Sequence, residues 1–312
     1  MSTDALTTTG GALSRLAMAR HPRIRWARLL AALPLHLLAA VLATVMIFPL
    51  LWMVSTSLKP PAEQFIFPPR LLPSEWLFEN YARAWRAARF SRYFINSSVV
   101  AVSGTILNLA VCAMAGYAFC KLEYKGRDAL FWVVLSSQMI PGIVTIIPSF
   151  LVVRAIPFAG GNDWLGRGGH GWLNSFAGLT IPGVGGAFGT FLLRQFFQSV
   201  PDDLLDAARV DGANEFRIFA QIVMPLAKPA LTALAIFTFQ GFWNDFLWPL
   251  VVTTDDRFRT VQLGLIVFRQ RFSTQWGPMM AGVTIATVPM ILVFLAGQRY
   301  FVSGIALTGL KG

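Results

Sequence analysis

Long apolar segments alternate with short polar ones along this sequence of 312 residues. A helix needs about 20 consecutive, mostly apolar residues to cross the hydrocarbon core of a bilayer. Segments of this kind lie at 35–54, 95–119, 129–153, 176–197, 230–252 and 279–301. Gly and Pro interrupt several of them, which neighbouring helices in a bundle can accommodate. The pattern therefore predicts an all-α integral membrane protein with six transmembrane helices.

The residues before the first apolar segment have a different character. Small and hydroxyl side chains dominate residues 2–14, a composition typical of a disordered tail. Arginines follow, at Arg15, Arg20, Arg23, Arg25 and Arg28. The apolar run that begins at residue 29 is longer than the core of a signal peptide, about 7–15 residues. We therefore expect a disordered cytoplasmic tail over 1–28 and one membrane domain over 29–312.

Composition indicates lipid as the main surroundings and argues against nucleic acid as a partner. Hydrophobic side chains make up 55% of the chain and charged ones 13%, whereas a soluble domain carries about 25% charged residues. The formal charge is +11, but the basic residues lie between the apolar segments, where loops meet anionic headgroups. Six spans place both termini on one side, and the basic tail beside the first span indicates the cytoplasm. The sequence predicts a multi-pass protein of the cytoplasmic (inner) membrane with both termini cytoplasmic.

Cysteine and histidine give no sign of a disulfide or a metal site. Cys112 and Cys120 are eight residues apart in one apolar segment, which is roughly 12 Å along a helix. Disulfide partners need Cα atoms within about 7 Å. The three histidines are scattered, so we expect two buried free thiols and no metal ion.

A polar insert over 199–229 separates the fourth and fifth apolar segments. Ser199 precedes Asp202 by three residues, which resembles a capping box at the start of a helix. Asp211 and Gly212 favour a sharp turn. Phe216, Phe219, Ala220 and Val223 then recur at the spacing of one helix face, before Pro225 and Pro229 end that helix. The insert is therefore expected to form two short helices, and the pattern alone leaves open a solvated loop without a partner.

The same insert resembles the EAA loop of ABC-transporter permeases. The spacing of Asp206-Ala207-Ala208, Gly212, Ile222 and Pro225 matches that loop, with Asp206 where Glu is usual and Met224 where Leu is usual. The resemblance implies a cytoplasmic coupling helix that docks on an ATP-hydrolysing subunit. The coupling residues would be Asp206, Ala207, Ala208, Arg209, Asp211, Gly212, Ala213 and Pro225.

Further segments are similar to the carbohydrate-importer branch of that family, the MalG-type permeases. They include Leu58-Lys59-Pro60, Asn80-Tyr81 and Trp243-Asn244-Asp245. The resemblance implies import of a sugar or oligosaccharide by alternating access. The implied partners are a second permease subunit (MalF-type), a dimer of ATP-binding subunits and an extracytoplasmic solute-binding protein. The chain contains no Gly-x-x-x-x-Gly-Lys-Ser/Thr phosphate loop, so we expect no enzyme activity and no cofactor on this chain, with ATP and Mg on the partner ATPase.

The fifth apolar segment carries the candidate translocation path. Gln240, Trp243, Asn244 and Asp245 lie within it, and polar residues inside membrane spans face a bundle or cavity more often than lipid. Aromatic faces and amides can bind a sugar. The alternative is an interfacial aromatic belt with a capping Asn-Asp pair.

Other functions remain open on the sequence. An importer of glycerol phosphate or another polar solute would use the same scaffold. A secondary transporter would show inverted repeats and a charged site at the membrane midplane, and a membrane enzyme would show clustered catalytic side chains. The sequence shows neither feature.

Overall fold

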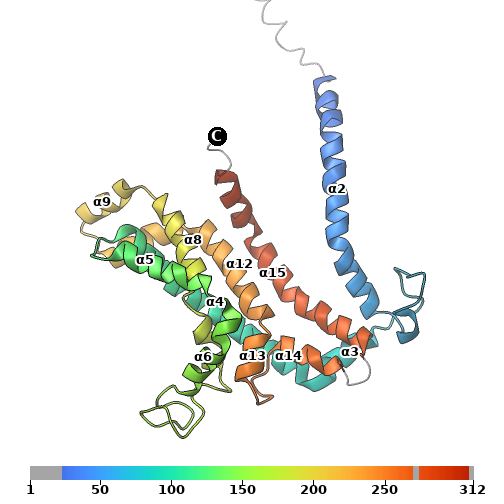
Figure 1. Ribbon diagram of the computed structural model, residues 1–312. Coiled ribbons are helices and arrows are strands. Elements are labelled where there is room, and N and C mark those ends of the chain that lie inside the picture. The colour runs from blue at the N-terminus through green and yellow to red at the C-terminus, as the bar shows by residue number, and fades with distance from the viewer. Residues whose placement is uncertain (1–22, 270–273, 309–312) are drawn as a thin grey trace, which may run out of the picture. The chain divides into compact units, whose positions relative to one another are not determined.

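The computed structural model describes residues 23–269 and 274–308 (Figure 1). These residues form two compact units, divided between Ser55 and Thr56. Most of the predicted tail, residues 1–22, lies outside the described residues. Helix α2 (Arg23–Ser57) begins inside that predicted tail. Every side chain from Leu33 to Leu51 is exposed, and the helix is apolar enough to cross a membrane.

The second unit is built from helices, and the described residues contain no β-strand. The prediction of an all-α chain is confirmed for this part. The helices are α3 (Glu79–Arg86), α4 (Phe90–Lys121), α5 (Arg127–Ser136), α6 (Gly142–Arg154), α7 (Phe176–Thr180), α8 (Ala187–Gln198), α9 (Asp202–Val210), α10 (Glu215–Ile218), α11 (Met224–Leu226), α12 (Lys228–Asn244), α13 (Leu247–Val252), α14 (Val261–Leu265) and α15 (Trp276–Thr308).

Among the described residues, three helices are long and apolar enough to cross a membrane alone: Ala32–Ser57, Phe90–Lys121 and Trp276–Tyr300. Three bent pairs reach the same criterion only when each pair is taken together. The bends are 106° between Arg127–Met139 and Gly142–Arg154, 48° between Phe176–Gly183 and Ala187–Gln198, and 80° between Glu215–Leu226 and Lys228–Asn244. By length and composition, the described residues therefore contain three to six candidate spans.

The breaks follow from local chemistry, and they lie in segments that the sequence already showed to be interrupted by Gly and Pro or, at Asp245, by a polar residue. Pro141 is the N-cap of α6, and its ring disfavours the helical conformation of the preceding residue, Ile140, which is extended. Gly185 has φ +83°, which interrupts the helix before α8. Helix α12 ends at Asn244, because Asp245 is extended and its side chain accepts a hydrogen bond from the Trp248 backbone N–H at 3.3 Å.

Helix α4 is the central element of the second unit and packs along α8 and α12 (Figure 1). A core cluster at this packing includes Cys112 and Tyr117 of α4, Leu193 and Phe197 of α8, and Leu234 of α12. Both cysteines are free thiols. No group of three His, Cys, Asp or Glu side chains that could hold a metal ion occurs within 23–269 and 274–308.

Candidate functional site

The insert between α8 and α12 begins differently from the expected capping box. Ser199 is the C-cap of α8, and its Oγ donates a hydrogen bond to the Phe196 carbonyl at 2.7 Å. Helix α9 begins at Asp202 with Pro201 at the N-cap position and without a side-chain cap. The expectation that Ser199 caps this helix is therefore wrong, because Ser199 completes the preceding helix instead.

The sharp turn predicted at Asp211 and Gly212 is present. Gly212 has φ +80°, a region that costs side chains other than Gly steric strain. Its N–H donates to the Arg209 carbonyl at 3.0 Å, and the Ala213 N–H donates to the Ala208 carbonyl at 2.9 Å. These two bonds form the Schellman arrangement, which fixes the direction in which the chain leaves a helix.

The second half of the insert is helical from Glu215 to Leu226. Asn214 caps α10 by accepting the Arg217 N–H at 2.8 Å. A π-helical turn (Phe219–Val223) and α11 continue the helix to the 80° bend before α12. Pro225 lies one residue before the end of this helix at Leu226, and Pro229 lies in the first turn of α12, where a missing N–H costs little. The helix therefore ends between the two prolines, as predicted.

The predicted apolar face of this second helix is divided between core and surface. Ile218 and Val223 are fully buried, whereas Phe216 is 73% exposed and Ala220 is also exposed. The π-helical turn shifts the register by adding a residue to one turn. A regular 3.6-residue period therefore assigned Phe216 and Ala220 to the wrong side.

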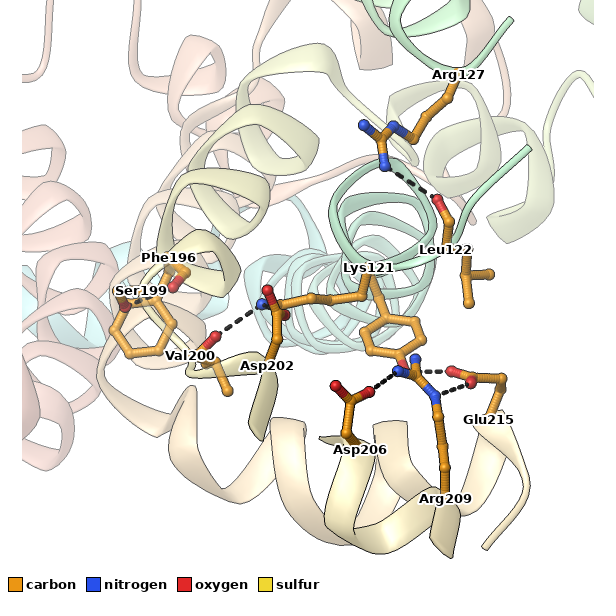
Figure 2. Close-up of polar contacts among 11 residues, drawn as sticks. Lys121, Leu122, Arg127, Phe196, Ser199, Val200, Asp202, Asp206, Arg209 and Glu215 are labelled. Carbon is orange, nitrogen blue, oxygen red and sulfur yellow. Dashed lines mark hydrogen bonds and ion pairs between the residues drawn. The ribbon is translucent and has the colours of Figure 1, made fainter. Parts of the chain in front are cut away.

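Figure 2 shows a polar network that joins the two short helices. The Arg209 guanidinium lies 2.6 Å from Asp206 Oδ1 and 2.8 Å from Glu215 Oε1. The Tyr117 hydroxyl of α4 donates to Glu215 Oε2 at 2.7 Å. The hydrogen bonds from Arg209 and then Tyr117 hold the pKa of Glu215 below its usual range. Asp206 therefore has a partner within the chain.

A second polar contact joins the start of α9 to the end of α4 (Figure 2). Lys121 Nζ lies 2.6 Å from Asp202 Oδ1 and donates to the Val200 carbonyl at 2.7 Å. The hydrogen bond from Lys121 holds the pKa of Asp202 below its usual range. The Asp202 carboxylate is therefore ionised at neutral pH, and the contact is a charge-assisted hydrogen bond.

The surface of the insert has exposed apolar side chains and a hollow. Val210 is 88% exposed, and Leu204 and Ala207 are also exposed. The hollow has a volume of about 220 Å³. It is lined by Ala208, Asp211, Ala213, Arg217, Ile218, Gln221 and Ile222. The small side chains of Ala208 and Ala213 leave the hollow open. Exposed apolar side chains on the same insert favour docking of another protein.

The structure does not bring the four predicted path residues together. Trp243 is 1% exposed in the core, and its Nε1 donates to the Ala286 carbonyl at 2.9 Å. Gln240 and Asn244 are exposed, and Asn244 Oδ1 accepts a hydrogen bond from Gln262 Nε2 at 3.3 Å.

Asp245 lines two open hollows of about 310 Å³ and 230 Å³, which also share Gly183 and Phe242. Asn108 and Thr238 line the larger one and hydrogen-bond each other at 2.9 Å. The sequence interpretation missed Asn108, although an amide inside an apolar segment was a usable signal.

Comparison with known proteins identifies relatives over most of the chain. The family described as "Binding-protein-dependent transport system inner membrane component" matches residues 111–307. The diacetylchitobiose uptake system permease protein NgcG of Streptomyces coelicolor is 34% identical over 268 residues, covering 85% of this chain and 84% of the relative. The sn-glycerol-3-phosphate transport system permease protein UgpE of Yersinia enterocolitica is 32% identical over 278 residues, covering 86% and 94%.

Solved structures share the fold. A chain of a bacterial ABC transporter involved in the import of the acidic polysaccharide alginate superposes with a TM-score of 0.73 at 24% identity, covering 89% of this chain and 98% of that chain. A chain of the alginate ABC transporter in complex with an alginate pentasaccharide-bound periplasmic protein gives a TM-score of 0.62 at 13% identity, covering 88% and 96%.

Proposed function

Because the chain belongs to the family of binding-protein-dependent transport system inner membrane components, we propose that it imports a sugar or oligosaccharide by alternating access, driven by separate ATPase subunits. The insert between α8 and α12 carries this proposal. Its two short helices, the turn at Gly212 and the exposed apolar surface around Ala208 suit a coupling loop that docks on an ATPase. Asp206, Ala207, Arg209, Asp211, Ala213 and Pro225 belong to the same candidate loop.

We further propose six transmembrane helices, in which the bent pairs over 127–154 and 176–198 each form one span and residues 230–252 form the fifth. The coupling loop over 199–229 then lies between the fourth and fifth spans. The tail over 1–28 and both termini then lie in the cytoplasm, with the membrane domain over 29–312. The arginines before the first span support this orientation.

The partners in this proposal follow from the surfaces that the chain leaves open. A dimer of ATP-binding subunits holds ATP and Mg and contacts the coupling loop. A second permease subunit faces the hollows around Asp245, and an extracytoplasmic binding protein delivers the solute. The chain itself lacks the phosphate-binding loop that ATP hydrolysis requires.

The hollows favour an uncharged solute over a phosphate. Neither lining contains Lys or Arg, whereas both contain Asp245 and the aromatic ring of Phe242. A phosphate is bound most strongly by Arg or Lys, while rings and carboxylates suit the faces and hydroxyls of a sugar. Glycerol phosphate is the second candidate, because a relative of similar identity is named as a permease for it. This solute would need Lys or Arg side chains from the partner permease.

Measurement of ATP turnover tests which subunits hydrolyse ATP. The purified chain is expected to hydrolyse no ATP. The complex with its natural permease and ATPase partners is expected to hydrolyse ATP faster when a sugar-loaded binding protein is added. A screen of sugars and sn-glycerol-3-phosphate on the co-purified binding protein separates the two solute candidates. ATP turnover by the single chain, free of contaminating ATPase, would contradict the proposal.

Asn244 tests whether the end of α12 lines the path. We expect Asn244→Cys, in a Cys112→Ala/Cys120→Ala background, to react with a water-soluble thiol reagent at a rate that changes when ATP closes the ATPase pair. Leu292→Cys on α15, also exposed here, is the control and should resist the reagent if it faces lipid. Labelling of Asn244→Cys at one rate in every state would indicate the aromatic-belt alternative.

A further inference from the structure

The cytoplasmic insert is fastened to α4, a helix far from it in sequence. Lys121 contacts Val200 and Asp202, which are 79 and 81 residues away, and Tyr117 contacts Glu215, 98 residues away. We propose that Lys121 and Tyr117 are positioning residues that make α4 move together with the coupling loop. This inference rests on the proposed function, because it assumes that movement of the ATPase subunits displaces the loop.

The contacts of Lys121 hold the end of α4 against the junction between α8 and α9. The Lys121 side chain is 6% exposed, whereas Asp202 is 76% exposed. An ammonium that has lost most of its water needs fixed partners, and Lys121 finds them in the Asp202 carboxylate and the Val200 carbonyl. Both partners belong to the junction between α8 and α9. A displacement of this junction therefore pulls on the end of α4.

Tyr117 makes the second contact of α4 with the insert, one helical turn before Lys121. Its ring packs edge-on against Phe197 of α8, with ring centroids 6.4 Å apart, and in a tilted arrangement against Phe219 of the π-helical turn, with centroids 5.2 Å apart. Its hydroxyl binds Glu215, which Arg209 holds from the other side. Leu205 of α9 is buried in the same core cluster. The insert thus contacts α4 through an apolar anchor and two polar contacts.

The far part of α4 lies at the candidate path. Helix α4 is uninterrupted from Phe90 to Lys121, and thirteen residues from Asn108 to Lys121 correspond to about 20 Å. Asn108 lines the larger hollow, donates to Thr238 Oγ1 of α12 and accepts the Gly185 N–H at the break before α8. One rigid helix therefore joins the coupling loop to the break in the fourth span and to the hollow.

A cysteine reporter in the hollow tests this transmission without knowledge of the solute. Gly241 lines the larger hollow, and a Cβ there meets nothing within 4 Å. Gly241→Cys in the Cys112→Ala/Cys120→Ala background is assembled with the partner permease and ATPase. A water-soluble methanethiosulfonate is the probe, applied with and without trapping by Mg-ATP and vanadate. With Lys121 present, trapping is expected to change the modification rate by about fivefold or more, the lower end of typical coupling.

Lys121→Met should leave the ATPase bound and trapped while reducing this change to less than about twofold. The exposed Asp202 stays hydrated in that variant, so the fold is retained. Lys121→Arg should restore the response. Lys125→Met is the control, because Lys125 is an exposed lysine four residues further along the chain, and it should not alter the response. Asp202→Asn should reduce the response less than Lys121→Met does, because Lys121 keeps its bond to the Val200 carbonyl. Adding Asp202→Asn to Lys121→Met should change nothing further, because Lys121→Met has already removed the contact with Asp202.

Tyr117→Phe provides a second measurement, since it keeps the ring packing and removes only the bond to Glu215. It should also reduce the response to trapping. A full response in both Lys121→Met and Tyr117→Phe would overturn the inference, as would additive losses in the Lys121→Met/Asp202→Asn pair. ATPase that fails to co-purify with the unmodified complex would instead contradict the proposed function itself.

Discussion

Gly212→Leu is expected to abolish solute uptake while the protein remains in the membrane. The Cβ of a substituted residue would meet no atom within 4 Å, so the defect is not a clash within the chain. It arises from the backbone, because φ is +80° at this position and a left-handed conformation costs a side chain about 1–2 kcal/mol. A relaxed turn would lose the bond from Ala213 to Ala208 and change the angle between α9 and α10. Gly212→Asn is the matched control, since Asn tolerates this region, and it should retain uptake.

Ala208→Arg is expected to give the same loss by a different route. Ala208 lines the hollow of about 220 Å³ at the surface of the insert, and an arginine would fill the hollow and separate a docked partner. Ala208→Ser keeps the size small and should behave as the unmodified chain. Recovery of the ATPase with the purified permease is the measurement. Normal recovery together with normal uptake in both Gly212→Leu and Ala208→Arg would contradict the docking surface.

The features that sequence predicted well are those set by neighbouring residues. The turn at Gly212 follows from a glycine placed two residues after the end of a short helix, and the apolar segments follow from length and hydropathy. These signals are local, so each can be read without knowing which segments pack together. The separation of Cys112 and Cys120 is also a local property, because both residues lie in one continuous helix, α4.

The features that sequence did not predict depend on contacts between distant segments. Ser199 could cap either the helix before it or the one after it, and the choice rests on where α8 ends. Trp243 belongs to an aromatic-rich segment, but only packing against Ala286 of α15 shows that it faces the core. The π-helical turn at 219–223 shifts Phe216 to the surface, and a regular helical period contains no signal for such a turn.

Asp206 shows the same distinction at the candidate site. Its resemblance to the acidic residue of an EAA loop assigned its carboxylate to a partner subunit, while the structure adds a partner within the chain, Arg209. The Asp206 side chain is 64% exposed, so one carboxylate can bind Arg209 and still face a docked protein. Substitutions that separate these two roles are therefore more informative than removal of Asp206 alone.

Arg209→Gln is expected to reduce the ATP hydrolysis stimulated by loaded binding protein roughly tenfold, a typical coupling factor, and Asp206→Asn is expected to reduce it less. Arg209 binds carboxylates on both short helices, Asp206 of α9 and Glu215 of α10. Its loss leaves two carboxylates facing each other without a cation, and like charges at close range repel. Asp206→Asn keeps the bond between Arg209 and Glu215, so α9 and α10 stay joined.

Arg209→Lys separates the charge of this contact from its geometry. A lysine retains the positive charge but lacks the planar fork that reaches two carboxylates at once, so it should give an intermediate rate of stimulated hydrolysis. Retention of the ATPase during purification shows that the complex is intact in every variant. If Asp206→Asn instead lowers the stimulated rate as much as Arg209→Gln, the Asp206 carboxylate acts directly on the ATPase. The bond to Arg209 would then serve only to orient that carboxylate toward its partner.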